Sequence, residues 1–213
     1  MTQAIKHPER ERHFGLLREL RMADWMTLLN GATGMAAIFS FLEYAVADHG
    51  QAVWVGAGLL ALALTFDILD GSVARKRRET SDVGRELDSL SDVVSFGVAP
   101  AVLGYAVGLR GAADMLLLSF FVACGISRLA RYNVTAVSRS DGSGKVRFYE
   151  GLPIPTSLLL GCVLLALFAL GRTGSLLPGG AWELGPVTLH PLSLLFFLHG
   201  LGMVSRTIRI PKP

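Results

Sequence analysis

The chain has 213 residues, of which 51% are hydrophobic and only 17% are charged, and its net charge is +3. Soluble domains carry about 25% charged residues, so this composition excludes an ordinary soluble protein and favours one whose surface faces a lipid bilayer. The basic residues lie in short runs beside apolar segments, a pattern typical of contact with anionic headgroups, and no nucleic-acid partner is expected.

Residues 1–23 lack the apolar core of a signal peptide. They resemble a short amphipathic juxtamembrane helix, in which Leu16, Leu17 and Leu20 enter the membrane interface and arginines meet anionic lipid. A solvated leader is the alternative. Residues 24–206 are predicted to form one membrane domain, and residues 207–213 a short tail.

A spanning helix needs about 20 mostly apolar residues. Pro100 is expected to kink the third such segment, and Pro153 and Pro155 are expected to mark the entry to the fifth. The predicted fold class is therefore an all-α integral membrane protein with six transmembrane helices. The segments are 25–47, 51–73, 89–109, 112–134, 154–171 and 187–205.

The basic residues also predict the orientation, because Lys and Arg are retained on the cytoplasmic side. With six spans, all of the 20 Lys and Arg residues except Arg110 and Arg172 fall on the side of the two termini. Both termini are therefore predicted to be cytoplasmic, in a multi-pass protein of the cell (inner) membrane.

Four aspartates occur where the second and third predicted spans meet the cytoplasm. Asp67 and Asp70 are three residues apart, and Asp88 and Asp92 are four apart, so each pair shares a helix face. The connection between the two spans is short, which predicts antiparallel neighbours. All four carboxylates can then converge on one point near the cytoplasmic surface.

Such a cluster resists burial unless protons or cations neutralise it. Carboxylate oxygens suit Mg²⁺, Mn²⁺ or Ca²⁺, and no Cys or His lies nearby to suggest zinc. Two divalent ions would balance four carboxylates. A two-metal site favours displacement at phosphorus, because the ions stabilise both the attacking and the leaving oxygen.

Small and basic residues around the aspartates fit the same chemistry. Gly71 and Ala74 leave the helix surface bare, so that a nucleotide or diphosphate can approach the backbone. Arg75 offers a forked donor to phosphate. Gly84 is expected in the connecting loop, near a base or ribose.

These residues resemble the signature of the CDP-alcohol phosphotransferases (CDP-alcohol phosphatidyltransferases), D-x2-D-G-x2-A-R-x8-G-x3-D-x3-D. The matching positions are Asp67, Asp70, Gly71, Ala74, Arg75, Gly84, Asp88 and Asp92. The resemblance implies six membrane helices, a homodimer and a metal site open to the cytoplasm. It also implies that the first three aspartates hold metal, with Asp92 as the catalytic base and a further candidate ligand.

Other stretches resemble the phosphatidylserine synthase branch of this family, namely residues 87–103, 128–134 and 148–155. That branch implies transfer of a phosphatidyl group from CDP-diacylglycerol to L-serine with release of CMP. The TLLN stretch implies that Thr27 and Asn30 contribute to CDP-lipid binding. Ala23-Asp24 departs from the Pro-Asn that the family often has there.

An amino-acid acceptor carries a carboxylate, which requires cationic donors. Arg128 and Arg131 share a face at the cytoplasmic end of the fourth span, with Asn133 nearby, and Lys145 and Arg147 follow in the next loop. A phosphorylated acceptor would use the same cluster. Glycerol phosphate, inositol phosphate and choline therefore stay open as acceptors, and so does an archaeal-type CDP-lipid donor.

Two functions outside this enzyme class fit the same residues less well. A cation transporter would place its acidic residues near the middle of the bilayer, whereas these aspartates gather at one face beside a basic loop. A non-catalytic scaffold would tolerate the loss of an aspartate, and none is missing from the signature.

Overall fold

The computed structural model describes residues 20–77, 82–139 and 148–211. The predicted juxtamembrane helix, Lys145 and Arg147 lie outside the described residues. The helices are α2 (Met22–Ala47), α3 (Gly50–Arg77), α4 (Asp82–Asp92), the π-helix η1 (Val93–Val98), α5 (Ala99–Val107), α6 (Ala112–Arg139), the 3₁₀-helix η2 (Ile154–Ser157), α7 (Leu158–Ala169), the 3₁₀-helix η3 (Gly174–Leu176) and α8 (Ser193–Val204).

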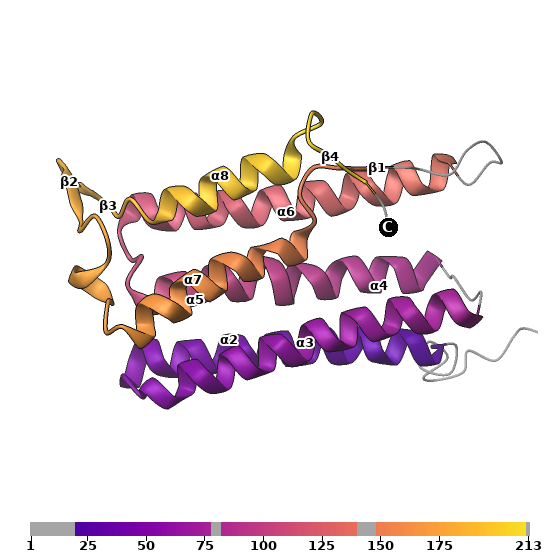
Figure 1. Cartoon of the computed structure of the whole chain (residues 1–213), viewed down its shortest axis with the longest axis horizontal. Helices are drawn as coiled ribbons and strands as arrows, with labels where there is room; N and C mark the ends of the chain where they lie inside the picture. Colours follow the sequence, from indigo (N-terminus) through magenta and orange to yellow (C-terminus); the bar gives the residue numbers. More distant parts are fainter. Residues whose placement is uncertain (1–19, 78–81, 140–147, 212–213) are drawn as a thin grey trace, which may run out of the picture.

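The helices form a bundle in three layers, as Figure 1 shows. One outer layer is the pair α2 and α3, and the other is the pair α6 and α8. The continuous run α4–η1–α5 lies between them, with α7 beside α5. The end of α3, the start of α4 and the end of α6 reach the same end of the bundle (Figure 1).

Short antiparallel strand pairs lie at both ends of the bundle. β1 (Phe148–Glu150) pairs with β4 (Arg209–Pro211), which joins the segment before α7 to the segment after α8. β2 (Trp182–Leu184) pairs with β3 (Val187–Leu189) at the opposite end.

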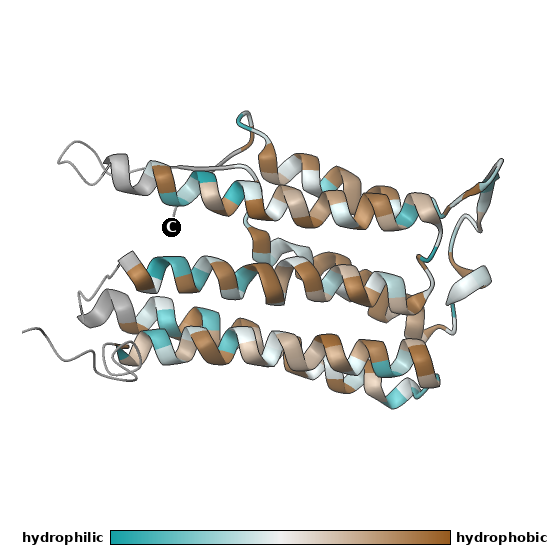
Figure 2. Cartoon of the chain, turned by 180° about the vertical axis from the view of Figure 1, so that it is seen from behind, coloured by the Kyte–Doolittle hydropathy of each residue, from teal (hydrophilic) through white to brown (hydrophobic). Residues whose placement is uncertain are grey.

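Within the described part of the chain, four helices are long and apolar enough to cross a membrane: Met22–Ala47, Gly50–Val73, Val83–Val107 and Ala112–Thr135. Ile154–Ala169 and Ser193–Val204 are shorter apolar helices. Large apolar side chains point outward, including Phe39, Val46 and Leu116, which are 61%, 87% and 71% exposed. Figure 2 shows hydrophobic residues along the middle of the helices. An outward apolar surface of this extent is typical of contact with lipid. The prediction of a helical membrane protein is therefore confirmed. The number of six spans and the orientation of the termini stay predictions.

Two predicted boundaries are wrong. The third predicted segment began at residue 89, with Gly84 in a loop, but α4 begins at Asp82 and Gly84 is helical. The first turns of α4 are polar, so hydropathy does not detect them, although α4 as a whole packs against α2 and α6. The sixth predicted segment began at residue 187, but the turn at Gly185 (φ 68°) and strand β3 come first, and α8 begins at Ser193.

The π-helix η1 changes the helical register directly after Asp92. Pro100, which follows η1, has no N–H to donate to the carbonyl one turn back. The Ser157 hydroxyl donates to the Phe96 carbonyl over 2.5 Å, so η2 supplies a donor at this point. Both side chains are fully buried, and η1 is therefore held from two sides, by η2 and by α2.

Candidate metal centre and active site

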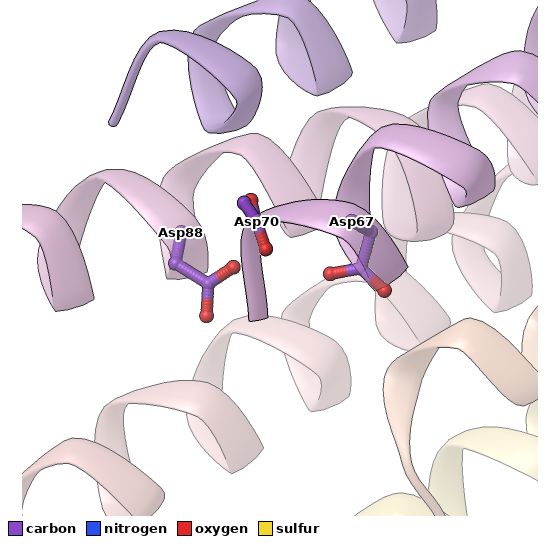
Figure 3. A group of neighbouring side chains, drawn as sticks. All are labelled: Asp67, Asp70 and Asp88. Atoms are coloured by element: carbon purple, nitrogen blue, oxygen red, sulfur yellow. The ribbon is translucent and has the colours of Figure 1, made fainter. Parts of the chain in front are cut away.

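Three of the four predicted aspartates form one compact group. Asp67 and Asp70 lie toward the end of α3, and Asp88 lies in α4. One carboxylate oxygen from each lies within 4.8 Å of the others. Asp70 is only 6% exposed, and the other two are partly buried. Figure 3 shows Asp70 between Asp67 and Asp88.

Asp92 adjoins this group from the next turn of the same helix as Asp88. Its side chain is 8% exposed and lies within hydrogen-bonding reach of Asp67. Arg128 of α6 interacts electrostatically with Asp92. The structure thus brings all four aspartates together between α3 and α4, as their helical spacing predicts, and the fourth interacts electrostatically with a cation of α6.

The chemistry of this donor set fits a divalent cation. The group offers oxygen atoms only, which suits Mg²⁺, Mn²⁺ or Ca²⁺ rather than a metal that prefers sulfur or imidazole. Like charges this close repel each other strongly in partly buried surroundings. A bound cation would convert that repulsion into attraction, so the Asp67–Asp70–Asp88 cluster can hold a metal ion.

Helix α2 contributes a donor to each acidic helix. The Thr27 hydroxyl donates to Asp70 Oδ2 over 2.7 Å, and Asn30 Nδ2 lies 3.4 Å from Asp92 Oδ1. Thr27 is 3% exposed and Asn30 is fully buried. The sequence assigned both residues to CDP-lipid binding, and the structure places both against carboxylates.

The predicted acceptor residues separate into two groups. Arg128 is 8% exposed, interacts electrostatically with Asp92 and lies over the Tyr132 ring, with 5.7 Å from Cζ to the ring centroid. Arg131 turns away, and its Nη1 donates to the carbonyl of Val204 at the end of α8 over 3.1 Å. The two arginines were predicted to share one face, and the structure gives them different partners.

Asn133 lies in the interface between α6 and α4. Its Nδ2 lies 3.0 Å from the hydroxyl of Ser89, and the Asn133 Oδ1 lies 3.3 Å from the same hydroxyl. Both side chains are buried. Ser89, one position after Asp88, has no motif of its own, so only the packing of α4 on α6 reveals it.

The remaining signature positions lie along the same helices. Gly71 follows Asp70 in α3 and is partly exposed, and Gly84 lies one turn before Asp88 in α4. For Ala74 and Arg75 the structure describes the helical backbone of α3 and no side-chain placement.

Asp24, the departure from the family pattern, has a local role. Its Oδ2 accepts a hydrogen bond from the backbone N–H of Arg21 over 2.8 Å, and the side chain is 6% exposed. An acidic residue at the third position of a helix stabilises the first turn in this way. The carboxylate therefore caps α2, the helix that carries Thr27 and Asn30.

Comparisons with known proteins show the family to which the chain is similar. A sequence profile described as CDP-alcohol phosphatidyltransferase matches residues 20–197. The CDP-diacylglycerol–serine O-phosphatidyltransferase of Saccharomyces cerevisiae is 41% identical over 100% of this chain and 78% of the yeast protein. The protein of that name from Methanocaldococcus jannaschii is 39% identical over 69% of this chain and 61% of its own length. The archaetidylserine synthase of Methanothermobacter thermautotrophicus is 39% identical over 65% of this chain and 54% of its own length.

Proposed function

The chain belongs to the CDP-alcohol phosphatidyltransferase family, and on this premise we propose that it transfers a phosphatidyl group from CDP-diacylglycerol to L-serine. The products are phosphatidylserine and CMP. The similarity to a serine O-phosphatidyltransferase along the whole chain carries the proposal. Serine is also the acceptor in the names of relatives whose donor lipids differ, which favours serine over glycerol phosphate, inositol phosphate or choline.

The reaction is a displacement at the phosphorus that bears the lipid. A bond forms between the serine hydroxyl oxygen and this phosphorus, while the bond from the phosphorus to the bridging oxygen breaks. CMP leaves with the electron pair of that bond. The hydroxyl proton passes to Asp92, which is assigned as the base because it is buried, adjoins the other aspartates and interacts electrostatically with Arg128.

The metal ligands would be Asp67, Asp70 and Asp88, with Asp92 as a further ligand. Two Mg²⁺ or Mn²⁺ ions bound there would neutralise the diphosphate and offset charge on the leaving group.

Arg128 is assigned to the serine carboxylate, because a guanidinium donates two parallel hydrogen bonds to a carboxylate. Because Arg128 interacts electrostatically with Asp92, it would hold the amino acid with the hydroxyl toward the base. Asn133, through Ser89, ties this part of α6 to the helix that carries Asp88. Electrostatic attraction of the acceptor toward the site is the role assigned to Arg131, Lys145 and Arg147.

The donor lipid is assigned to the faces of α3 and α4 that carry the signature. Gly71, Ala74 and Gly84 would let the nucleotide approach the helix backbones, and Arg75 would bind phosphate. The acyl chains would stay in the bilayer. With six spans and both termini in the cytoplasm, the site faces the cytoplasm of the cell (inner) membrane, and two copies form a homodimer.

CMP release by purified protein in lipid nanodiscs tests this function. The assay contains CDP-diacylglycerol and Mg²⁺ or Mn²⁺, with and without L-serine, and its parallel arms contain glycerol phosphate, inositol phosphate, choline or a diether CDP-lipid. We expect release that requires serine and is abolished by a chelator. The matched control is Glu43→Gln, a change of a 57% exposed carboxylate whose partner is His49.

Each alternative has its own outcome in this assay. Release with a phosphorylated polyol and none with serine would reject the acceptor and retain the family chemistry. Serine-dependent release from the diether lipid alone would reject the donor. Release that persists in the presence of a chelator would reject the metal assignment.

A further inference from the structure

Helix α2 packs against both helices that carry the aspartates, α3 and α4. One of its faces is buried along the site, with Thr27, Asn30 and Gly34 at helical spacing. The two polar members of this face each meet one carboxylate. The helix therefore contacts the cluster from outside, through donors that the signature does not include.

Thr27 fixes one oxygen of Asp70. Its hydroxyl lies 2.7 Å from Asp70 Oδ2 and 3.1 Å from the Ala23 carbonyl of its own helix. A threonine in a helix has few χ1 rotamers, so the hydroxyl position follows from the backbone. With 3% of Thr27 exposed, the side chain has little surface to offer a ligand.

Asn30 is held in the same way beside Asp92. Its backbone carbonyl accepts from the Ser95 hydroxyl of η1 over 3.0 Å, which ties this turn of α2 to the turn after Asp92. Its Nδ2 lies 3.4 Å from Asp92 Oδ1, and among the described residues its Oδ1 has no donor. The residue is fully buried, so Asp92 is the charged group to which its amide donates.

Close packing fixes the distance between these groups. A Cβ placed on Gly34 would lie 2.8 Å from Ser95 Cα, and one placed on Gly31 would lie 3.0 Å from Ser91 Oγ. Absence of side chains at these two positions lets α2 approach α4 and η1 at backbone distance. The donors of α2 thus keep a set position relative to Asp92.

We infer that Thr27 and Asn30 are positioning residues for the aspartate cluster, not contacts to the nucleotide. Thr27 orients Asp70 for the metal, and Asn30 orients Asp92 toward the acceptor hydroxyl. The inference rests on the proposed function for the role of Asp92, and on the metal cluster alone for the role of Thr27. Outer partners of this kind change metal affinity or activity by roughly 10–100-fold when they are removed.

Mn²⁺ binding to substrate-free protein, followed by electron paramagnetic resonance, tests the role of Thr27. Thr27→Val keeps the shape of the side chain and removes the donor, and we expect Mn²⁺ affinity to fall by roughly 10–100-fold. Thr27→Ser should restore it. Thr33→Val is the matched control, because among the described residues the Thr33 hydroxyl bonds only to the carbonyls of Leu29 and Asn30 in the same helix.

Unchanged Mn²⁺ affinity in Thr27→Val, with a raised KM for CDP-diacylglycerol, would overturn the inference and restore the nucleotide contact. Thr27→Ala supplies the same readout if the valine variant does not fold. Because no acceptor is present, this measurement stands even if serine proves to be the wrong substrate.

Steady-state kinetics with whichever acceptor the wild type uses test Asn30. Asn30→Leu should lower kcat by roughly 10–100-fold, while Mn²⁺ affinity and the KM for CDP-diacylglycerol stay near the wild-type values. Asn30→Gln should recover part of kcat, because it retains the amide. A raised KM for the lipid at unchanged kcat would overturn the assignment. Asn30→Ser, a smaller polar variant, supplies the comparison if leucine prevents folding.

Discussion

Buried carboxylates at the two ends of the bundle have opposite surroundings. At the β2–β3 end, Asp114 of α6 is fully buried and accepts three hydrogen bonds, from the N–H of Gly111 at 2.9 Å, the N–H of His190 at 2.8 Å and His190 Nδ1 at 2.6 Å. It also lies in the first turn of a helix, where negative charge is favourable. The Asp114 carboxylate thus obtains its hydrogen bonds from the protein itself.

At the other end, four carboxylates converge on one another. Thr27 and Asn30 donate to two of them, and Arg128 interacts with Asp92. Hydrogen bonds to neutral groups orient a carboxylate but do not cancel four like charges. A buried carboxylate that accepts hydrogen bonds from the protein therefore has a structural role, whereas buried carboxylates that face each other indicate a cation from outside the chain.

The largest expected effect comes from removing one charge of the cluster. Asp88→Asn should lower kcat by roughly 10⁴-fold, because a bound metal contributes several kcal/mol to transition-state stabilisation. Mn²⁺ affinity of the substrate-free protein should fall with it. Wild-type Mn²⁺ affinity in this variant would show that the cluster is not the metal site, and Glu43→Gln controls for loss of a carboxylate elsewhere.

A smaller loss is expected at the fourth aspartate. Asp92→Asn should lower kcat by roughly 10³-fold, within the range for a general base, and should weaken Mn²⁺ binding less than Asp88→Asn does. This difference would distinguish the base from the three metal ligands. Substantial turnover by folded Asp92→Asn protein would remove the assignment of the base.

Local periodicity made the cluster predictable, because spacings of three and four residues place aspartates on one helix face whatever the rest of the fold does. The complete signature made the family predictable as well. The donors of α2 and the partner of Arg131 were not predictable. Val204 is 73 residues from Arg131 and Asp92 is 62 from Asn30, so these contacts depend on how the helices pack.

Helix boundaries were predicted wrongly where the composition of a segment does not indicate its structure. The start of α4 is polar and helical, so a search for apolar runs begins the helix several residues late. The sequence does not indicate the pairing of His190 with Asp114, because the two residues are 76 apart along the chain. The role of His190 becomes visible only when strand β3 lies against the start of α6.

Arg128 provides the third prediction. Arg128→Lys keeps the charge and loses the forked donor. The KM for serine should therefore rise roughly 30-fold, equivalent to about 2 kcal/mol, whereas the KM for CDP-diacylglycerol should change little. Arg110→Lys is the matched control, since Arg110 also lies over a tyrosine ring, Tyr105, and is bound to backbone carbonyls. An unchanged KM for serine would show that the acceptor binds away from α6.

The smallest effect on catalysis is expected at the satisfied acid. In Asp114→Asn an amide nitrogen would replace a carboxylate oxygen that accepts hydrogen bonds from N–H donors. The free energy of unfolding should therefore fall by about 1–3 kcal/mol. Thermal denaturation in detergent measures this change. The folded variant should retain wild-type kcat and Mn²⁺ affinity, because Asp114 has its own donors and lies at the far end of α6 from Arg128. A fall in Mn²⁺ affinity without loss of stability would contradict the comparison, since the two ends of the bundle would then be coupled and Asp114 would be part of the site.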